Sequence, residues 1–370
     1  MRTAFGARPK GARLERMKAS PRWVDGAFRN VHPMLPGLRE PVRMPTIAEF
    51  ICGGERRVPP APLPTGDPRA AWSRTSESGL RVTWLGHSTL LIEVDGVTVL
   101  TDPVWCDRAS PFQVAGPKRF QPPVARLEDL PRVDVIVLSH DHYDHLDFVT
   151  FRKLAAWKTP VVTSLGVGAH LEAWGVRRDR IVEVDWWERA HVPGLDLEIT
   201  ATPAQHFSGR TIGGRNATLW SSFVLRGASH TVFFGADTGL TTLYRDIAAR
   251  FGPFDVAMLE VGAHHPAWGD IHLGPVNAVA ALDMLGNPPF LPIHWGTFNL
   301  AMHAWDAPIE RLVELVPKRV AMLVPQLGEA IEPAAGARVD PWWRRVARMP
   351  ARPAPADDAG AATQASWPLD

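Results

Sequence analysis

Three histidines and three aspartates lie within nine residues of this chain, in the segment SHDHYDHLD from Ser139 to Asp147. The whole chain has 14 histidines among 370 residues, so this segment is strongly enriched in them. Imidazole nitrogens and carboxylate oxygens, without a thiolate, suit zinc and other first-row divalent metals. The segment therefore predicts a metal site, with a solvated loop rich in histidine as the alternative.

The spacing of the motif His-x-His-x-Asp-His favours the metal site. The motif follows Val133–Ser139, an apolar run typical of a strand buried on both faces, and loops at strand ends often carry functional sites. Residues i and i+2 of an extended segment point the same way, so His140 and His142 can bind one ion. A turn of the chain then lets Asp144 and His145 face a second ion.

Three further polar residues follow or interrupt apolar runs later in the chain. His206 ends TATPAQH, Asp237 ends TVFFGAD and His294 lies within PFLPIHW. Each has an ordinary explanation on its own, because single histidines are commonly packed in cores and an aspartate before Thr238 can cap a helix. Their joint occurrence after the histidine motif favours one shared site.

Longer motifs between Leu80 and Phe298 carry a family resemblance. They are VTWLGHSTLLIEVDG, LTDPVW, SPFQVAGPKRF, LSHDHYDHLD, VDWWE, TPAQHFSGRT, FFGADTG, RFGPFDVAMLEVGA and IHWGTF. The histidine motif with the later His, Asp and His looks like the metallo-β-lactamase superfamily. GPKRF, DWWE and HWGTF are more specific, and with them the chain resembles the N-acylphosphatidylethanolamine-hydrolysing phospholipase D family and its bacterial relatives.

This resemblance implies a four-layer αββα sandwich, the metallo-β-lactamase fold, with two divalent metal ions between the loop edges of its sheets. Zn²⁺ is the expected metal. The first ion would be held by His140, His142 and His206. The second would be held by Asp144, His145 and His294. Asp237 would bridge both ions.

Other polar residues would act beside the metals. Asp102, in LTDP, would orient a ligand histidine or the aspartate loop, although a turn aspartate before proline fits its position equally well. Asp144 would also handle the proton of the attacking water. His272, in GDIHLGP, matches a family histidine near the substrate head group and would contact the phosphate or assist the leaving group; an exposed loop histidine is the alternative. We interpret His87 as a packed histidine.

Several residues differ from the family pattern near the expected site of the substrate head group, so the sequence does not determine the contacts with that head group. His264 and His265 differ from the residues that are commoner in the family after VGA, and Ile271 stands where the animal enzyme has a polar residue. Lys118 and Arg119, in GPKRF, would bind an anionic substrate or form a structural ion pair.

Two divalent ions that share a water molecule lower its pKa toward about 7, so a metal-bridging hydroxide is the expected nucleophile. GHSTL is not the G-x-S-x-G motif of serine hydrolases. Together with this chemistry, the family resemblance implies a dinuclear-metal-dependent phosphodiesterase of phospholipase D type that acts on N-acyl phosphatidylethanolamine-like lipids. The alternatives are a metal-dependent lactonase or other carbonyl ester hydrolase, and a non-catalytic protein with a structural metal site.

The elements that must position these residues alternate from Leu80 onward. Asp95-Gly96 separates two β-rich runs, which is a strong hairpin signal, and the later apolar runs predict further strands. Strands with interleaved helices fit a two-sheet core covered by helices on both outer sides. Helices are expected at FVTFRKLAAW, Thr241–Phe251, Gly274–Leu285 and Pro308–Val316.

Composition divides the chain into three parts. Residues 1–78 are rich in Pro, Arg and Gly and predict an irregular extension packed on the core, with a local helix near Thr46–Cys52. Residues 79–347 are expected to form the metallo-hydrolase domain. Residues 348–370 are rich in Ala and Pro and predict a disordered tail.

The overall composition bounds location and partners. The formal net charge is +1, and no basic stripe supports nucleic-acid binding. No run approaches the roughly 18 apolar residues of a spanning helix, and the basic N-terminus lacks the apolar region of a secretory signal. Cys52 and Cys106 form no disulfide framework, which favours a reducing compartment. We expect a cytoplasmic protein with a small-molecule or phospholipid substrate, and leave peripheral contact with the inner membrane and a homodimer open.

Overall fold

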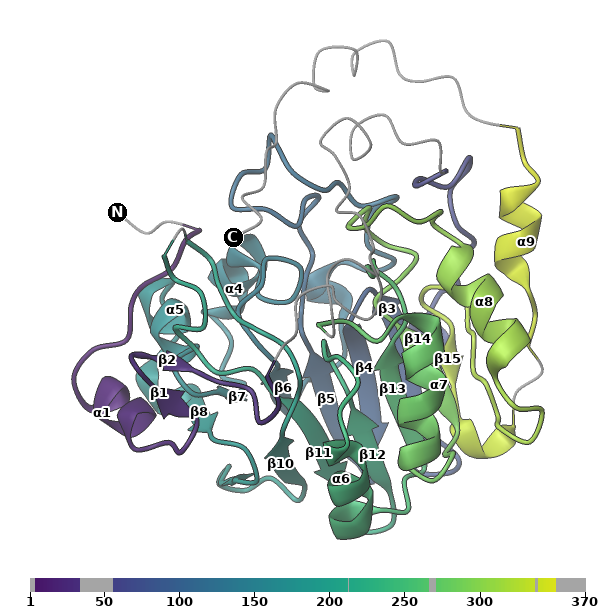
Figure 1. Cartoon of the computed structure of the whole chain (residues 1–370). Helices are drawn as coiled ribbons and strands as arrows, with labels where there is room; N and C mark the ends of the chain where they lie inside the picture. Colours follow the sequence, from purple (N-terminus) through teal and green to yellow (C-terminus); the bar gives the residue numbers. More distant parts are fainter. Residues whose placement is uncertain (1–3, 34–55, 212, 266–270, 337–338, 351–370) are drawn as a thin grey trace.

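The computed structural model describes residues 4–33, 56–211, 213–265, 271–336 and 339–350. Two β-sheets lie face to face, and helices cover the outer face of each, so the layers follow the order helix, sheet, sheet, helix (Figure 1). This arrangement confirms the expected αββα sandwich. The helix expected at Thr46–Cys52 and the tail beyond residue 350 lie outside the described residues.

One sheet has seven strands in the order β15-β3-β4-β5-β6-β7-β8. Strands β3 to β5 pair antiparallel, whereas β5 to β8 pair parallel. Asp95 and Gly96 join β4 to β5 with φ values of 48° and 85°, as a two-residue hairpin turn requires, which confirms the expected hairpin. The strands are β3 (Leu80–Gly86), β4 (Thr89–Val94), β5 (Val97–Thr101), β6 (Val135–Leu138), β7 (Val161–Ser164), β8 (Ile181–Val184) and β15 (Ala330–Ile331).

The other sheet has six strands in the order β14-β13-β12-β11-β10-β9. Strands β9 to β12 pair antiparallel, and β12 to β14 pair parallel. The carboxyl ends of β12, β13 and β14 therefore meet at one edge of this sheet. The strands are β9 (Arg189–Ala190), β10 (Glu198–Thr202), β11 (Ser222–Arg226), β12 (Thr231–Phe234), β13 (Val256–Glu260) and β14 (Phe290–Ile293).

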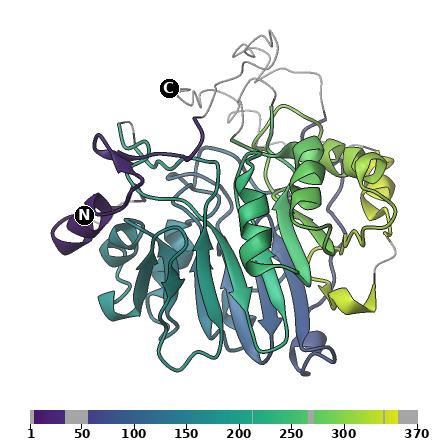
Figure 2. The same cartoon turned by 60° about the horizontal axis from the view of Figure 1, so that its bottom comes forward.

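Helices α4 and α5 cover the seven-stranded sheet, and α6 and α7 cover the six-stranded sheet, with α8 packed on α7 (Figures 1 and 2). Helices α4, α6, α7 and α8 lie where the sequence predicts helices. The Asp147 side chain accepts hydrogen bonds from the main-chain nitrogens of Val149 (2.9 Å) and Thr150 (3.2 Å) at the start of α4. The helices are α4 (Phe148–Leu154), α5 (Gly168–Ala173), α6 (Leu243–Phe251), α7 (Gly274–Met284), α8 (Ala307–Leu315) and α9 (Trp342–Ala347).

The N-terminal part of the chain contains regular elements that its composition did not predict. They are short, so the Pro, Gly and Arg residues around them obscure any periodicity. They are helix α1 (Ala12–Lys18), the hairpin of β1 (Trp23–Val24) and β2 (Ala27–Phe28), and helix α3 (Arg69–Trp72). Short 3-10 helices elsewhere are η1 (Leu127–Asp129), η2 (Arg178–Arg180) and η4 (Pro333–Ala335).

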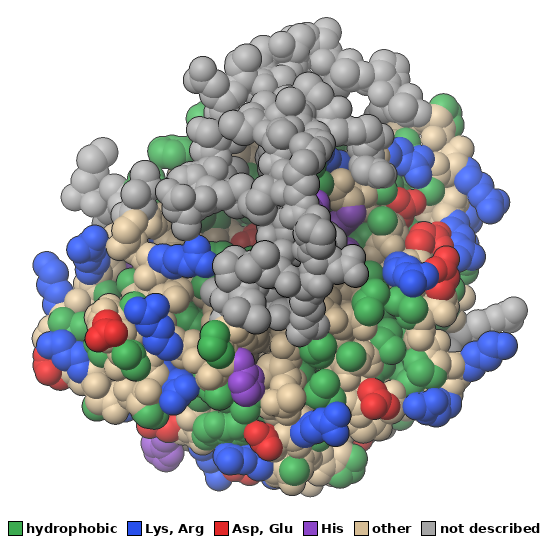
Figure 3. All heavy atoms as spheres, viewed as in Figure 1, with side chains coloured by type: hydrophobic (Ala, Val, Ile, Leu, Met, Phe, Trp, Pro, Cys, Tyr) green, Lys and Arg blue, Asp and Glu red, His purple; other side chains and the backbone are tan. Residues whose placement is uncertain are grey.

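The seven-stranded sheet is buried on both faces. Successive side chains of a strand point to opposite faces, and in β4 Ile92 belongs to the apolar cluster between the sheets while Leu91 belongs to the cluster under α4 and α5. Val137 and Ile136 divide in the same way in β6. On the face in Figure 3, basic, acidic and apolar side chains are interspersed over the described residues.

Candidate metal centre

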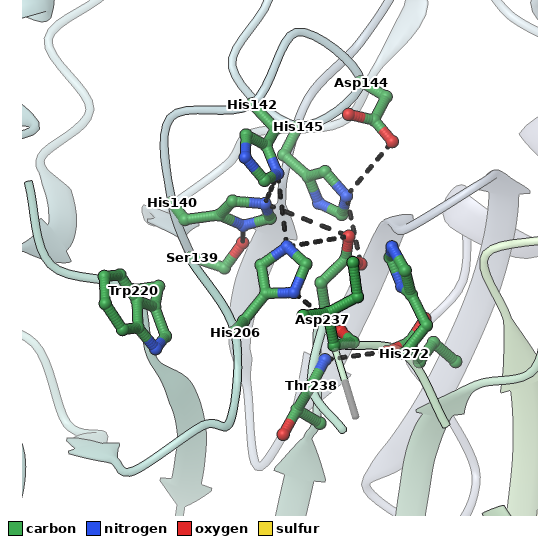
Figure 4. Close-up of polar contacts among 12 residues, drawn as sticks. Ser139, His140, His142, Asp144, His145, His206, Trp220, Asp237, Thr238 and His272 are labelled. Atoms are coloured by element: carbon green, nitrogen blue, oxygen red, sulfur yellow. Dashed lines mark hydrogen bonds and ion pairs between the residues drawn. The ribbon is translucent and has the colours of Figure 1, made fainter. Parts of the chain in front are cut away.

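The seven side chains expected to bind metal meet at one edge of the sandwich (Figure 4). Loops that follow β6, β10, β12 and β14 carry them, so strands of both sheets aim their carboxyl ends at the same place. Each loop follows a strand buried in the core, which fixes the start of the loop. The sequence-predicted set is therefore brought together without exception: His140, His142, Asp144, His145, His206, Asp237 and His294.

The first group consists of three histidines and one aspartate. His140 Nε2 lies 2.8 Å from His142 Nδ1, and the same His142 nitrogen lies 3.2 Å from His206 Nε2. Asp237 closes the group, and one ligand atom from each of the four residues lies within 4.8 Å of the others. His140 and His206 are almost completely buried. Three nitrogens and one oxygen therefore face one small volume.

Asp237 lies between this group and a second one. Its Oδ2 is 3.9 Å from His140 Nε2 and 3.7 Å from His206 Nε2. Its Oδ1 is 3.1 Å from His145 Nε2 and 3.2 Å from His294 Nε2. The two oxygens of one carboxylate thus face different histidine pairs, which is the geometry that a bridging ligand needs.

Asp144 completes the second group. Its Oδ2 lies 3.5 Å from His145 Nε2 and 3.3 Å from His294 Nε2. Although burial acts in the opposite direction, the charge of His145 holds the pKa of Asp144 well below its ordinary range. Asp144 is therefore an ionised carboxylate at neutral pH.

The donor set fits divalent cations. Burial holds the pKa of His140 and His206 well below the ordinary value, so these rings are neutral and have lone pairs to offer. Burial opposes the charged form of His294 too, but the carboxylates of Asp237, Asp144 and Glu260 together outweigh it and raise the pKa of His294 to about 10. The second group thus attracts positive charge. Asp237 Oδ1 lies 3.1 Å from His145 Nε2 and 3.2 Å from His294 Nε2, yet none of these three buried atoms makes a hydrogen bond of normal geometry among the described residues, which is rare for buried polar atoms.

Asp102 lies behind the second group, at the end of β5. Its Oδ2 lies 2.7 Å from His145 Nδ1, and its Oδ1 accepts a hydrogen bond of 2.7 Å from the main-chain nitrogen of Ser139. Because Nδ1 of His145 is bonded to Asp102, Nε2 is left to face Asp144 and Asp237. Asp102 is fully buried, so it is in a position to orient a ligand histidine.

Substitution of Asp102 by asparagine tests this arrangement. The side chain keeps its shape, but the amide loses the charge that orients His145, so we expect the metal affinity of the group that contains His145 to fall by roughly 10–100-fold. Competition with a chromogenic chelator measures this affinity. The exposed Asp196→Asn variant is the control, and equal affinities for Asp102→Asn and the wild type would contradict the role.

His87 lies inside the site rather than only in the core. Its Nε2 is 2.9 Å from Asp144 Oδ2, and its ring centroid is 3.9 Å from that of His294. Burial lowers the pKa of His87 to about 3, so the ring is neutral and Nε2 can donate to the carboxylate. The interpretation of His87 as packing alone is incomplete, because the turn between β3 and β4 reaches the same edge as the ligand loops.

Glu260 is a site residue that the sequence interpretation did not single out. It ends β13 and is fully buried, and its Oε2 lies 2.6 Å from His272 Nδ1. Its Oε1 accepts hydrogen bonds from the main-chain nitrogens of Thr238 (2.7 Å) and Leu273 (3.3 Å). The only indication in the sequence is that Glu260 is a charged residue at the end of the apolar run DVAMLEV, where a strand is expected to end.

His272 stands beside both groups. Its ring centroid is 5.1 Å from that of His206 and 5.3 Å from that of His294, and only 13% of its side chain is exposed. The preceding residue contributes through its main chain, because His206 Nδ1 lies 2.7 Å from the carbonyl oxygen of Ile271. The interpretation of His272 as an exposed loop residue therefore does not hold.

Arg210 is a second residue that the sequence interpretation missed. Its buried guanidinium donates Nη1 hydrogen bonds to the carbonyl oxygens of Asp141 (2.6 Å) and Leu146 (2.8 Å), at both ends of the motif loop. It also lies over the Tyr143 ring, 4.0 Å from its centroid. Asp141 points away from the ligands, and its Oδ1 accepts from the main-chain nitrogen of Gly209 at 2.8 Å. These contacts fix the shape of the loop.

Loss of the Arg210 guanidinium should destabilise the whole domain. Arg210→Met leaves several buried carbonyl oxygens without donors, so we expect the free energy of unfolding to fall by about 3–5 kcal/mol. Urea denaturation measures it. Arg177→Met is the control, because Arg177 is an exposed residue paired with Asp179 and its loss should leave the free energy of unfolding nearly unchanged. Equal losses in the two variants would refute this reasoning.

The GPKRF segment has a structural role at Arg119. This buried guanidinium donates to the carbonyl oxygens of Cys106 (2.9 Å) and Val104 (2.8 Å), and lies over the Phe298 ring. Within the part of the chain that the structure describes, Arg119 therefore bonds to main-chain oxygens rather than to a carboxylate. Lys118 is exposed.

Comparison with known proteins agrees with this geometry. The family model described as the Beta-lactamase superfamily domain matches residues 97–295. The chain belongs to this superfamily. An uncharacterized protein of Mycobacterium tuberculosis is 46% identical over 88% of both chains. The N-acyl-phosphatidylethanolamine-hydrolyzing phospholipase D 1 of Caenorhabditis elegans is 37% identical over 66% of this chain and 72% of the relative.

More distant relatives are also described as metal-dependent hydrolases. A UPF0173 metal-dependent hydrolase of Methanopyrus kandleri is 28% identical to this chain. The match covers 68% of this chain and 100% of the relative. The solved structure of a metallo hydrolase from Ignicoccus hospitalis has the same fold, with a TM-score of 0.53 and 21% identity over 68% of this chain and 97% of that one. The chain is therefore an enzyme, a metal-dependent hydrolase of the metallo-β-lactamase superfamily. Among the described residues, no helix combines the length and apolarity needed to cross a membrane.

Proposed function

We propose that this hydrolase is a phosphodiesterase of phospholipase D type that acts on N-acyl phosphatidylethanolamine-like lipids. The observation that carries the proposal is the 37% identity to the Caenorhabditis elegans phospholipase over 72% of that enzyme. The motifs GPKRF, DWWE and HWGTF support it, because they are more specific than the histidine motif that the whole superfamily shares.

The two groups of ligands would hold two divalent ions, most readily Zn²⁺. The first would bind His140, His142 and His206. The second would bind Asp144, His145 and His294, with Asp237 bridging both. The converging lone pairs and the unpartnered atoms of Asp237, His145 and His294 support this assignment. When bound, such a pair of ions acidifies a shared water and neutralises charge that develops on the phosphoryl oxygens.

The residues of the chain would move the protons of the reaction. Hydrolysis joins the oxygen of water to phosphorus and breaks the bond from phosphorus to the ethanolamine oxygen, which yields phosphatidic acid and an N-acylethanolamine. The Asp144 carboxylate would accept the proton of the attacking water. His272 would donate a proton from Nε2 to the departing oxygen, because its Nδ1 is bonded to Glu260.

Electrostatics around His272 support the donor role. Burial lowers the pKa of His272, but the Glu260 carboxylate outweighs burial, so the net pKa lies above the ordinary value. The raised pKa favours the protonated form of His272, which a group that protonates a leaving alkoxide needs. A positioned acid of this kind typically contributes about 10²–10⁴-fold to the rate.

The test is a comparison of substrate panels with the metal-loaded enzyme. We expect N-acyl phosphatidylethanolamine in mixed micelles to release an N-acylethanolamine and phosphatidic acid, as measured by mass spectrometry. His272→Asn is expected to lose most of this turnover while it keeps its metals. Turnover of lactones or carboxylic esters without any phosphodiester would instead identify a carbonyl ester hydrolase and overturn the proposal.

A further inference from the structure

The N-terminal segment 4–32 lies against the loops that carry the first ligand group. In Figure 1 it is the purple part of the chain, with α1 and the hairpin of β1 and β2 beside the seven-stranded sheet and the loops above it. Its main anchor is apolar: Met17 and Phe28 are fully buried in one cluster with Leu219 and Trp220. This apolar cluster holds the segment against the rest of the domain, so the polar groups of the segment have fixed positions.

Asn30 makes both main-chain hydrogen bonds of His206. Its Nδ2 donates to the His206 carbonyl oxygen at 2.8 Å, and its Oδ1 accepts from the His206 main-chain nitrogen at 3.1 Å. Trp220 Nε1 also donates to Asn30 Oδ1, at 3.1 Å. An acceptor and two donors around the amide define its orientation, because only Nδ2 can donate and only Oδ1 can accept.

These contacts act where strand pairing has ended. β10 ends at Thr202, so His206 lies in a loop beyond the ladder to β11. The Asn30 amide supplies the pair of hydrogen bonds that a neighbouring strand would give, and so fixes the direction in which the His206 side chain leaves the main chain. On the ring itself, the carbonyl oxygen of Ile271 bonds Nδ1, so Nε2 is left for the ion.

The same segment reaches the loop that carries the other two histidines of the group. The main-chain nitrogen of Ala7 donates to His170 Nδ1 at 3.0 Å, and His170 Nε2 lies 3.3 Å from Asp141 Oδ2, between His140 and His142 in sequence. Arg210 Nη2 donates to the Ala4 carbonyl oxygen at 2.7 Å while its Nη1 holds the motif loop. Both loops that carry the histidines of the first group are thus attached to one segment.

We propose that segment 4–32 is an integral part of the first metal site and that Asn30 is the positioning residue for His206. Asn30 touches no metal ligand atom and acts only through the His206 main chain. The inference rests on the proposed ligand set, in which His206 binds the first ion together with His140 and His142. It assigns to Asn30 a role in metal affinity that is confined to one of the two ions, because Asn30 contacts the His206 main chain and not the loop that carries Asp144 and His145.

Asn30→Asp tests the positioning role in the full chain. The variant keeps the size of the side chain but has no donor for the His206 carbonyl oxygen, so two acceptors face each other. We expect the affinity for one of two Zn²⁺ equivalents to fall by roughly 10–100-fold, and the affinity for the other to stay unchanged. Chelator competition measures both, and the visible spectrum of the Co²⁺-loaded protein should change for one ion only.

Gly6→Ala provides an independent variant at the other contact. Gly6 has a φ of +77°, and an added Cβ would lie 2.0 Å from His170 Nδ1, so the segment must shift away from His170. We expect the same ion to be weakened. The control is Arg16→Gln, because Arg16 is a half-exposed residue of this segment whose contacts are to Glu183 and Glu188 rather than to a ligand loop. Urea unfolding of the metal-free proteins establishes that all variants fold.

His206→Ala separates failure of this inference from failure of the ligand set. In one contradicting outcome, His206→Ala loses one equivalent of Zn²⁺ but Asn30→Asp and Gly6→Ala bind both equivalents normally. This outcome would overturn the role of the segment and leave the ligand set intact. Two equivalents of unchanged affinity in His206→Ala would overturn the ligand set and the inference with it. Parallel weakening of one ion in all three variants, with Arg16→Gln like the wild type, is the expected result.

Discussion

Replacement of Asp237 by alanine is expected to abolish turnover and to release at least one metal ion. The reason is that Oδ1 and Oδ2 of this residue face the two different ligand groups, so one substitution removes an oxygen ligand from both. We expect the rate to fall by more than about 10³-fold, because generation of the nucleophile and neutralisation of phosphoryl charge both depend on the pair of ions. Plasma mass spectrometry of protein dialysed against limiting Zn²⁺ gives the metal content, and release of N-acylethanolamine gives the rate.

Asp283→Ala is the matched control for this experiment. Asp283 is an exposed aspartate of α7, far from any ligand, and its loss should leave metal content and rate unchanged. Asp237→Asn adds a second comparison, because the amide keeps one oxygen ligand and the shape of the side chain. We expect it to retain more metal than Asp237→Ala. Two full equivalents bound to Asp237→Ala with wild-type affinity would contradict the bridging role.

The sequence predicted the fold and the central residues of the site for one physical reason. Each predicted ligand follows a short apolar run, and a buried strand must end at the edge of its sheet. His140 after β6 and Asp237 after β12 are examples, and parallel pairing of β12, β13 and β14 then brings the strand ends together. The polar residues that follow the apolar runs and the packing of the two sheets therefore place the ligands at the same edge of the sandwich.

Asp102 and His272 were named from the sequence, but several other residues around the ligands could not be predicted in this way. Asn30 bonds to a residue 176 positions away, and nothing in the local pattern of residues 1–78 indicates that partner. Arg210 and Glu260 are single charged residues within loop or strand motifs, where an exposed charge is the ordinary expectation. His87 needs a φ of 54° to turn its ring into the site, a conformation that the sequence does not specify. These roles depend on tertiary contacts.

Glu260→Gln is expected to give the second largest effect on catalysis. The amide cannot stabilise the His272 imidazolium, so we expect the rate on N-acyl phosphatidylethanolamine to fall by about 10²–10⁴-fold, as for loss of a general acid. Bis(p-nitrophenyl) phosphate should be affected much less, because its leaving group needs no proton. The activity limb at high pH should move to lower pH, because the Glu260 carboxylate is what raises the pKa of His272 against the effect of burial.

Two comparisons test whether Glu260 and His272 act as a proton-donating pair or whether Glu260 instead takes part in metal binding. Glu260 Oε2 lies 3.8 Å from His294 Nδ1, so this carboxylate could in principle affect metal binding. A Glu260→Gln variant that keeps both equivalents of Zn²⁺ assigns the loss of rate to His272, whereas loss of an ion would assign it to the metal centre. If Glu260 acts on catalysis only through His272, the double variant with His272→Asn should be no slower than His272→Asn alone. Additive losses in the double variant would mean that Glu260 acts by a separate route.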